Sequence, residues 1–239
     1  MKRHFANLIA ALLIFTSILA QPEKKDETIT LSLDSFTTKI GRLPSPQIID
    51  ARSPEEFAYN HIIGALNFNL QTADYARFVQ ALDKTKPVFI YAINTGRSSA
   101  LARELKHQGF SAVYDLAGGI ANWIGSGQPY YTSTKKGLSL PEYKNIIAAH
   151  QTVLVDIGSR YCAACKKIKP VLDSLRKENG EAVKIVEIDL EESPSLIAAL
   201  KTVNLFPYLI LYNQGTIILK KAGADAVKSA IDAALAKQK

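Results

Sequence analysis

The chain of 239 residues holds two cysteines, Cys162 and Cys165, in a Cys-x-x-Cys spacing. They follow an apolar run at 153–157 and precede a helical pattern that reaches about residue 177. Such a dithiol suits disulfide exchange, because the free N–H groups and the positive dipole end of a helix N-terminus stabilise a thiolate. We expect Cys162 to be exposed and to attack, and Cys165, buried one turn later, to resolve the mixed disulfide. This chemistry requires sulfurs within bonding reach that a visiting chain can approach.

Other uses of the two cysteines fit less well. A structural disulfide would close a very short loop and add only about 2 kcal/mol of stability. A zinc site needs about four ligands, and none of the histidines (His4, His61, His107 and His150) lies within ten residues of either cysteine. Buried free thiols that fill a core stay open as an alternative, although the flanking residues are polar. No metal and no organic cofactor is implied.

The residues around the dithiol resemble the active-site segment of the thioredoxin superfamily, and the resemblance covers about the last hundred residues. Tyr161 stands where the family usually has Trp, and Ala163 and Ala164 stand where thioredoxin has Gly-Pro. Pro170 matches the proline that kinks the family's active-site helix, so we expect the helix to be interrupted there. The resemblance implies a disulfide oxidoreductase whose partners are protein dithiols and disulfides.

The resemblance also implies roles for residues outside the motif. Asp156, six residues before Cys162, matches the buried acid that moves a proton at the resolving thiol, and burial should raise its pKa. The alternative for Asp156 is an acid near a strand end that reaches solvent. Pro207 matches the family's cis-proline, and with Phe206, Gly223 and Tyr161 it is expected to shape the substrate groove.

Periodicity predicts the elements of this second domain without the resemblance. Their order is α, β, α, β, α, β, β, α, which is a thioredoxin-like fold with a mixed sheet. The helices are expected to start at 139, 162, 193 and 224, and the strands at 152–157, 182–190, 208–212 and 216–220.

Residues 29–131 have a different pattern, in which short apolar runs alternate with helical stretches. The expected strands are 47–50, 87–91 and 112–116, and the expected helices are 34–40, one that begins at 53–56, and 97–108. Strands that alternate with helices indicate a parallel sheet with helices on both faces, so the whole chain is α/β.

The motifs of this first domain resemble the rhodanese family in their order. They are DARSPEEF at 50–57, HIIGA at 61–65 and LAGGIANW at 116–123. The family's sulfur-carrying cysteine opens the loop after the strand at 87–91, but this chain has Ala92 there. Alanine cannot hold a persulfide, so we expect no sulfur transfer by the covalent route.

The loop itself keeps the family's length of six residues and its closing Arg97. Backbone N–H groups at a helix N-terminus form an anion cradle. Two predictions for this loop therefore stay open. One is weak binding of a small anion or a persulfidated partner, and the other is that the loop now serves only packing or docking. The residues concerned are Ala92, Asn94, Gly96 and Arg97.

Charge differs between the two domains. Residues 30–131 carry nine basic and eight acidic side chains, whereas 132–239 carry sixteen and eleven. Part of this excess, Arg160, Lys166, Lys167 and Lys169, is expected to favour the thiolate of Cys162; Lys167 and Lys169 fit a solvated helix face equally well. No aromatic residues are interleaved with the basic ones, so nucleic acid is not an expected partner.

The N-terminus indicates export. Basic residues at 2–4 precede an apolar run at 8–20, which is typical of a secretory signal and short for a membrane span. We expect a periplasmic protein with no stable membrane anchor after cleavage; an uncleaved anchor is the alternative. The predicted division is a signal at 1–20, a disordered lead-in at 21–28, the rhodanese-like domain at 29–131, a linker at 132–138 and the thioredoxin-like domain at 139–239.

The sequence thus predicts an exported thiol–disulfide oxidoreductase with a catalytically silent first domain. Two other functions stay open. One is a sulfur-handling scaffold that binds and reduces persulfidated partners, and the other is a non-catalytic interaction protein. The residues between the cysteines, Ala163 and Ala164, do not indicate the direction of electron flow.

Overall fold

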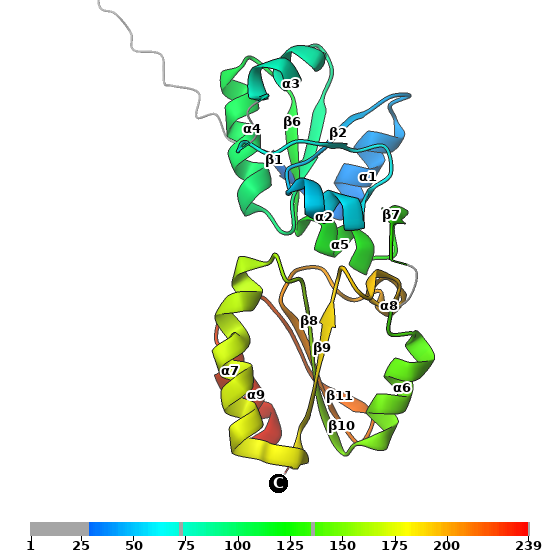
Figure 1. Ribbon diagram of the computed structural model, residues 1–239, viewed down its shortest axis with the longest axis vertical. Coiled ribbons are helices and arrows are strands. Elements are labelled where there is room, and N and C mark those ends of the chain that lie inside the picture. The colour runs from blue at the N-terminus through cyan, green and yellow to red at the C-terminus, as the bar shows by residue number, and fades with distance from the viewer. Residues whose placement is uncertain (1–28, 72–73, 135–136, 239) are drawn as a thin grey trace, which may run out of the picture.

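The computed structural model describes residues 29–71, 74–134 and 137–238. Two layered domains are stacked along the long axis of the molecule (Figure 1). The predicted signal at 1–20 and lead-in at 21–28 lie outside the described residues. None of the helices in the described ranges is long and apolar enough to span a membrane.

The first domain is built on a parallel sheet, as predicted. Its strand order is β1-β6-β5-β2-β4, and all four pairings are parallel. The strands are β1 (Ile29–Leu31), β2 (Gln47–Asp50), β4 (Leu66–Asn67), β5 (Val88–Tyr91) and β6 (Val113–Leu116). The helices are α1 (Leu33–Gly41), α2 (Pro54–Tyr59), α3 (Tyr75–Ala81), α4 (Gly96–His107) and α5 (Gly119–Gly125).

Strand β5 explains why this sheet is covered on both faces. Its side chains alternate, so Phe89 and Tyr91 join one buried cluster while Val88 and Ile90 join another. All four are fully buried. A continuous apolar strand of this kind has no face left for solvent.

A small second sheet closes the first domain. Strand β7 (Tyr130–Thr132) pairs antiparallel with β3 (Asn60–Ile62), and Thr132 lies opposite Asn60. β7 therefore extends one residue into the stretch predicted as a linker. Strands of two or three residues that pair across 70 positions of sequence leave no periodicity to read, and we did not predict them.

The second domain has the predicted mixed sheet, with the order β11-β10-β8-β9. β8 pairs parallel with β9 and antiparallel with β10, and β10 and β11 form the hairpin. The strands are β8 (Thr152–Gly158), β9 (Lys184–Asp189), β10 (Tyr208–Asn213) and β11 (Thr216–Ala222). The helices are α6 (Leu140–Ala149), α7 (Ala163–Asn179), α8 (Pro194–Leu200) and α9 (Val227–Ala236), and η1 (Gly180–Ala182) is a 3₁₀ turn.

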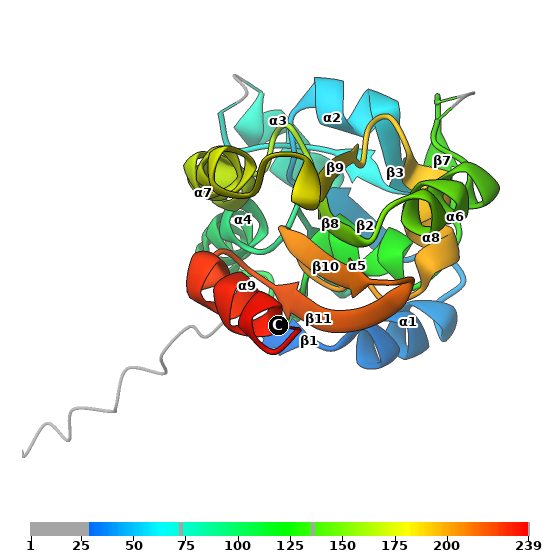
Figure 2. The same cartoon turned by 90° about the horizontal axis from the view of Figure 1, so that it is seen from below.

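The helices of the second domain cover opposite faces of its sheet. Figure 2 shows α7 and α9 on one side and α6 and α8 on the other. Ile168, Leu172 and Leu175 of α7 are buried against the first side. α7 runs without a break through Pro170, so the predicted interruption is wrong. Proline removes one N–H donor from the helix ladder, and this buried apolar face keeps the rest of the helix in place.

The two domains share one core. A single buried cluster contains Ile93 and Ile124 of the first domain together with Cys162, Val203 and Phe206 of the second. The N-terminal end of α7 points at the first domain (Figure 1). The functional residues of the second domain therefore have to be described together with the first.

Candidate active site

Cys162 lies at the N-terminus of α7, as predicted. It is the N-cap residue, and its Sγ accepts a hydrogen bond from the backbone N–H of Cys165 at 3.2 Å. Both cysteines are free thiols. A hydrogen bond from the Cys165 thiol, aided by the backbone N–H groups of Cys165 and Ala164, lowers the pKa of Cys162, although burial acts against it. The same thiol–thiol hydrogen bond and burial raise the pKa of Cys165. Of the two thiols, Cys162 is therefore the one whose thiolate is favoured.

The exposure of the two cysteines is the reverse of the prediction. Cys162 is only 1% exposed, whereas Cys165 is half-buried. Cys162 belongs to the buried cluster that also contains Ile93 of the first domain. Sequence periodicity describes a helix terminus, and it carries no information about a second domain that packs over it.

Cys165 opens onto a crevice beside α7. The crevice has a volume of about 320 Å³, and Asp156, Gly158, Lys166 and Glu187 are among its lining residues. Solvent and small reagents can therefore approach the resolving sulfur from the side of the sheet.

Asp156 lies beside this crevice with one carboxylate oxygen unpaired. It is 9% exposed, and its Oδ1 finds no hydrogen-bond partner among the residues that the structure describes. Burial, and then the charge of Glu187 directly opposite on β9, raise the pKa of Asp156 to about 7, against the opposing charge of Arg176. An acid of that pKa can take up or release a proton near neutrality, next to Cys165.

The basic residues near the dithiol contribute less than expected. Arg160 pairs with Asp189 at 3.0 Å and with Glu192 at 2.5 Å. Two carboxylates thus balance its charge. Lys169 lies 3.9 Å from Asp173 on the next turn of α7. Local hydrogen bonds, rather than these cations, lower the pKa of Cys162.

A second buried acid near the dithiol was not predicted. Glu191 is 1% exposed and accepts a hydrogen bond from Ser159 Oγ at 3.0 Å. Burial, and then the neighbouring Asp189, raise the pKa of Glu191. Adjacent acids after a strand usually indicate a solvated turn, so the sequence gives no signal here. Over the ranges that the structure covers, no three or more His, Cys, Asp or Glu side chains are grouped to hold a metal ion.

Three of the residues predicted to shape a groove, Phe206, Pro207 and Gly223, are close together. The Phe206–Pro207 peptide bond is cis, as the resemblance implied. The N–H of Gly223 donates to the Pro207 carbonyl at 2.8 Å. Tyr161 is half-buried and faces the first domain, where burial, followed by a hydrogen bond to Glu55, raises its pKa. The roles of these residues toward a substrate stay predictions.

The backbone of Phe206 is already paired. Its N–H donates to Asn94 Oδ1 at 3.2 Å, and its carbonyl accepts from Asn94 Nδ2 at 3.0 Å. Asn94 belongs to the loop after β5, which we considered as an anion cradle. The structure therefore brings together two candidate sites that the sequence placed in separate domains.

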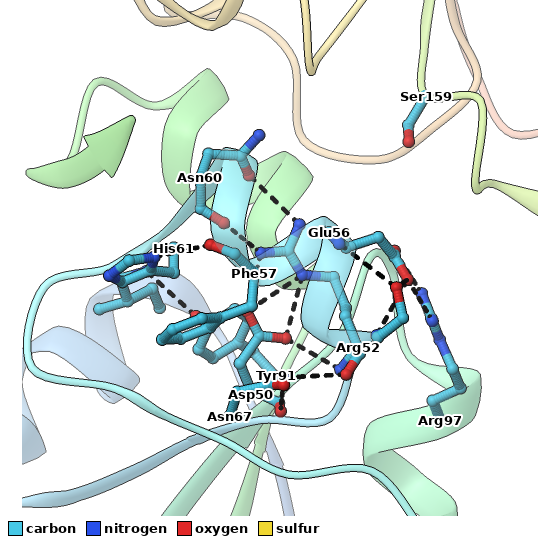
Figure 3. A network of polar contacts seen from close by, with 12 residues as sticks. Asp50, Arg52, Glu56, Phe57, Asn60, His61, Asn67, Tyr91, Arg97 and Ser159 are labelled. Carbon is cyan, nitrogen blue, oxygen red and sulfur yellow. Dashed lines mark hydrogen bonds and ion pairs between the residues drawn. The ribbon is translucent and has the colours of Figure 1, made fainter. Parts of the chain in front are cut away.

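Two other residues of that loop, Ala92 and Arg97, are paired within the first domain. Ala92 is 1% exposed, and its carbonyl accepts from the N–H of Ile120 at 2.8 Å. The Arg97 guanidinium donates to both carboxylate oxygens of Glu56, at 2.5 and 2.7 Å (Figure 3). Burial opposes ionisation of Glu56, but this pair with Arg97 lowers its pKa. The charge of Arg97 is thus engaged, and Gly96 begins α4 beside it.

The first domain has another ion pair, between Arg52 and Asp50, and it is fully buried. Arg52 is fully buried and binds the Asp50 carboxylate, at 2.7 Å for its shortest contact. Its guanidinium also donates to the side chain and the backbone carbonyl of Asn60 (Figure 3). Sequence patterns had marked residue 52 only as part of a motif.

Comparisons with known proteins match the two domains separately. The model of the rhodanese-like domain matches residues 33–126, and the thioredoxin model matches residues 135–237. Mitochondrial thioredoxin-3 of Saccharomyces cerevisiae is 33% identical over 98 residues, which are 41% of this chain and 76% of that protein. The thiosulfate sulfurtransferase GlpE of Actinobacillus pleuropneumoniae serotype 5b is 34% identical over 86 residues, 36% of this chain and 78% of its own.

Other relatives match over a smaller part of their length. The chain spans 38–63% of several curated relatives, some of them thioredoxins. A crystal structure of oxidised mitochondrial thioredoxin 3 from Saccharomyces cerevisiae covers 44% of this chain and 95% of its own, at 28% identity and a TM-score of 0.38. On the sequence matches, the chain belongs to the rhodanese-like and thioredoxin families and joins one domain of each in that order.

Proposed function

We propose that the protein is a thiol–disulfide oxidoreductase that works through Cys162 and Cys165. The observation that carries this proposal is the position of Cys162 at the N-terminus of α7, where hydrogen bonds lower its pKa. The thioredoxin relatives support the same reaction class. These two arguments hold whichever direction electrons flow in the cell.

The proposed reaction has two steps. The Cys162 thiolate attacks a disulfide of a protein substrate, so that a mixed disulfide forms and the other substrate sulfur leaves as a thiolate. Cys165 then gives its proton to Asp156 and attacks the Cys162 sulfur. The substrate leaves as a dithiol. The protein has given two electrons to it and is left with a Cys162–Cys165 disulfide. A separate dithiol reductant must return it to the reduced form.

The first domain is proposed to be silent in sulfur transfer. Ala92 offers no sulfur atom, and Arg97 is engaged with Glu56. An assay of sulfur transfer from thiosulfate to cyanide should give only background rates with the unaltered chain. Export is also part of the proposal, since residues 1–20 have the pattern of a secretory signal.

An equilibrium redox titration tests the oxidoreductase proposal. The protein is equilibrated with mixtures of reduced and oxidised dithiothreitol, and the two forms are separated by mass after quenching. A reversible Cys162–Cys165 disulfide with one defined potential is expected. Cys165→Ser should instead accumulate a mixed disulfide at Cys162 when it is incubated with a cystine-containing peptide, and Cys162→Ser should not. If no disulfide forms between the two cysteines at any ratio, a non-catalytic interaction protein is the better description.

A further inference from the structure

The site predicted to receive a substrate is occupied by the protein itself. Cys162 is 1% exposed, and Phe206, also 1% exposed, has both backbone groups bonded to Asn94. We propose that the first domain is an internal ligand of the second: Asn94 holds the Phe206 edge until an extended segment of a partner polypeptide replaces it. This inference rests on the proposed function, and it names the class of substrate for it.

The chemistry of Asn94 supports the comparison with a peptide. An asparagine side chain ends in one carbonyl and one NH₂ group, so it offers the same acceptor and donor as a backbone amide. One residue that exchanges both N–H···O bonds with its partner is the pattern of a paired position between antiparallel strands. Asn94 thus makes the two bonds that a residue of an added strand would make.

Burial makes these two bonds specific. Because Phe206 is 1% exposed, water does not reach its N–H and carbonyl while the domains are docked. Buried backbone groups without partners are costly. A ligand that removes the first domain must therefore replace both bonds, which a polypeptide can do and a small disulfide cannot.

The rest of the interface depends on close approach of backbones. A Cβ atom at Gly125, in the last turn of α5, would overlap the carbonyl of Val203 in the second domain, and one at Gly118 would overlap the carbonyl of Asn204. Apart from its own helix, the nearest atoms to Gly125 all belong to Val203. Gly125 has a negative φ, so alanine fits its backbone conformation. Gly125→Ala is therefore a change aimed at docking alone.

Docking of this kind is strong because it is intramolecular. A tethered ligand acts at an effective concentration in the millimolar range when its linker is short. Interfaces between domains of one chain nevertheless open readily unless they are large and apolar. A polypeptide substrate then competes with Asn94 for the backbone groups of Phe206, whereas a small disulfide reacts with Cys162 only when the interface opens by itself.

The rate of alkylation of Cys162 by iodoacetamide tests the proposal in the full-length chain. The Cys165→Ser background leaves Cys162 as the only thiol, and rates are compared at a pH above the point where they stop rising, so that only access differs. Asn94→Ala and Gly125→Ala should each react at least about tenfold faster than the parent, since each removes or obstructs contacts that hold the domains together. Gly41→Ala is the matched control, because a Cβ there meets nothing within 4 Å. Its rate should be unchanged.

Two outcomes would overturn the proposal. One is that the parent already reacts as fast as Asn94→Ala and Gly125→Ala while both variants stay folded by circular dichroism. The other is that Asn94→Ala speeds the reaction of Cys162 with a cystine-containing polypeptide and with hydroxyethyl disulfide by the same factor. The factor should be smaller for the polypeptide if it already displaces Asn94. Failure of the oxidoreductase itself looks different, because the dithiothreitol titration would then show no Cys162–Cys165 disulfide.

Discussion

Two buried aspartates, one in each domain, are treated in opposite ways. Asp50 ends β2 and is fully buried, and Arg52 covers its carboxylate. Asp156 lies in β8, is 9% exposed, and keeps one oxygen without a partner in the described part of the chain. Both stand in interior strands of their sheets.

The difference separates a structural charge from a chemical one. A buried carboxylate with a cation beside it contributes to one defined packing, whereas the carboxylate of Asp156 can gain or lose a proton near neutral pH. In the first domain the carboxylates of Asp50 and Glu56 are paired with cations, Arg52 and Arg97. The second domain leaves one oxygen of Asp156 unpaired beside Cys165, where the proposed reaction moves a proton.

The largest expected effect is on Arg52. Arg52→Met removes the cation and leaves the Asp50 carboxylate buried and unpaired, which should lower the free energy of unfolding of the first domain by about 3–5 kcal/mol. Trp123, the single tryptophan of the chain, lies in this domain and is 7% exposed. Urea unfolding followed by tryptophan fluorescence therefore reports on the first domain.

A double variant sharpens this test. Asp50→Asn combined with Arg52→Met removes both charges, so it should recover part of the stability that Arg52→Met loses. A loss below about 1 kcal/mol for Arg52→Met would mean that Asp50 is not dependent on its partner, and the contrast with Asp156 would disappear.

Asp156→Asn should raise the free energy of unfolding, whereas Arg52→Met should lower it. In the folded protein Asp156 keeps its proton up to a pH of about 7, whereas in the unfolded chain it ionises near its ordinary pKa of 3.8. The unfolded state therefore binds fewer protons between these pH values, and stability falls as pH rises through this window. Asparagine avoids this penalty, so the variant should be more stable than the parent at pH 8, by at most about 4 kcal/mol. The gain should vanish near pH 4.

Unfolding by urea at pH 4, 6 and 8, followed by circular dichroism, measures this dependence. Asp225→Asn replaces an exposed aspartate of the same domain and should give the same difference from the parent at every pH. The same two variants separate the kinetic role of Asp156, because only Asp156→Asn should slow resolution of a mixed disulfide. A pH-independent Asp156→Asn difference would show that folding does not shift the pKa of Asp156.

The elements around the active cysteines could be predicted because they depend on local pattern. The apolar run of β8, the Cys-x-x-Cys spacing and the hairpin at 213–215 are each read within a few residues, and so is the parallel sheet of the first domain. The cis-proline needed a resemblance as well, since local sequence favours a trans bond.

The docking of the domains could not be predicted in this way. Asn94 and Phe206 are 112 residues apart, and one loop asparagine looks like many others. The burial of Cys162 follows from that docking, so the exposure expected from a helix N-terminus was wrong. Glycine at residue 125 within a helix was the one local hint, because glycine there costs helix stability unless another backbone must come close.

The smallest effect concerns two matched helix starts. α2 and α6 both begin with a capping box, in which Ser53 pairs with Glu56 and Ser139 pairs with Glu142. Glutamine can also serve in the box, so Glu142→Gln should change the free energy of unfolding by less than about 0.5 kcal/mol.

Glu56→Gln should cost more, about 1–2 kcal/mol, because Glu56 is 1% exposed and its charge also binds Arg97. Since Arg97 lowers the pKa of Glu56, this extra stability is present above the ordinary pKa of 4.5 and is lost as pH falls below it. The Glu56→Gln difference should therefore shrink from pH 7 to pH 3 in urea unfolding followed by Trp123 fluorescence. Equal costs for the two glutamates at pH 7 would show that Arg97 does not bind Glu56 in solution, and would leave its charge available for an anion at the loop after β5.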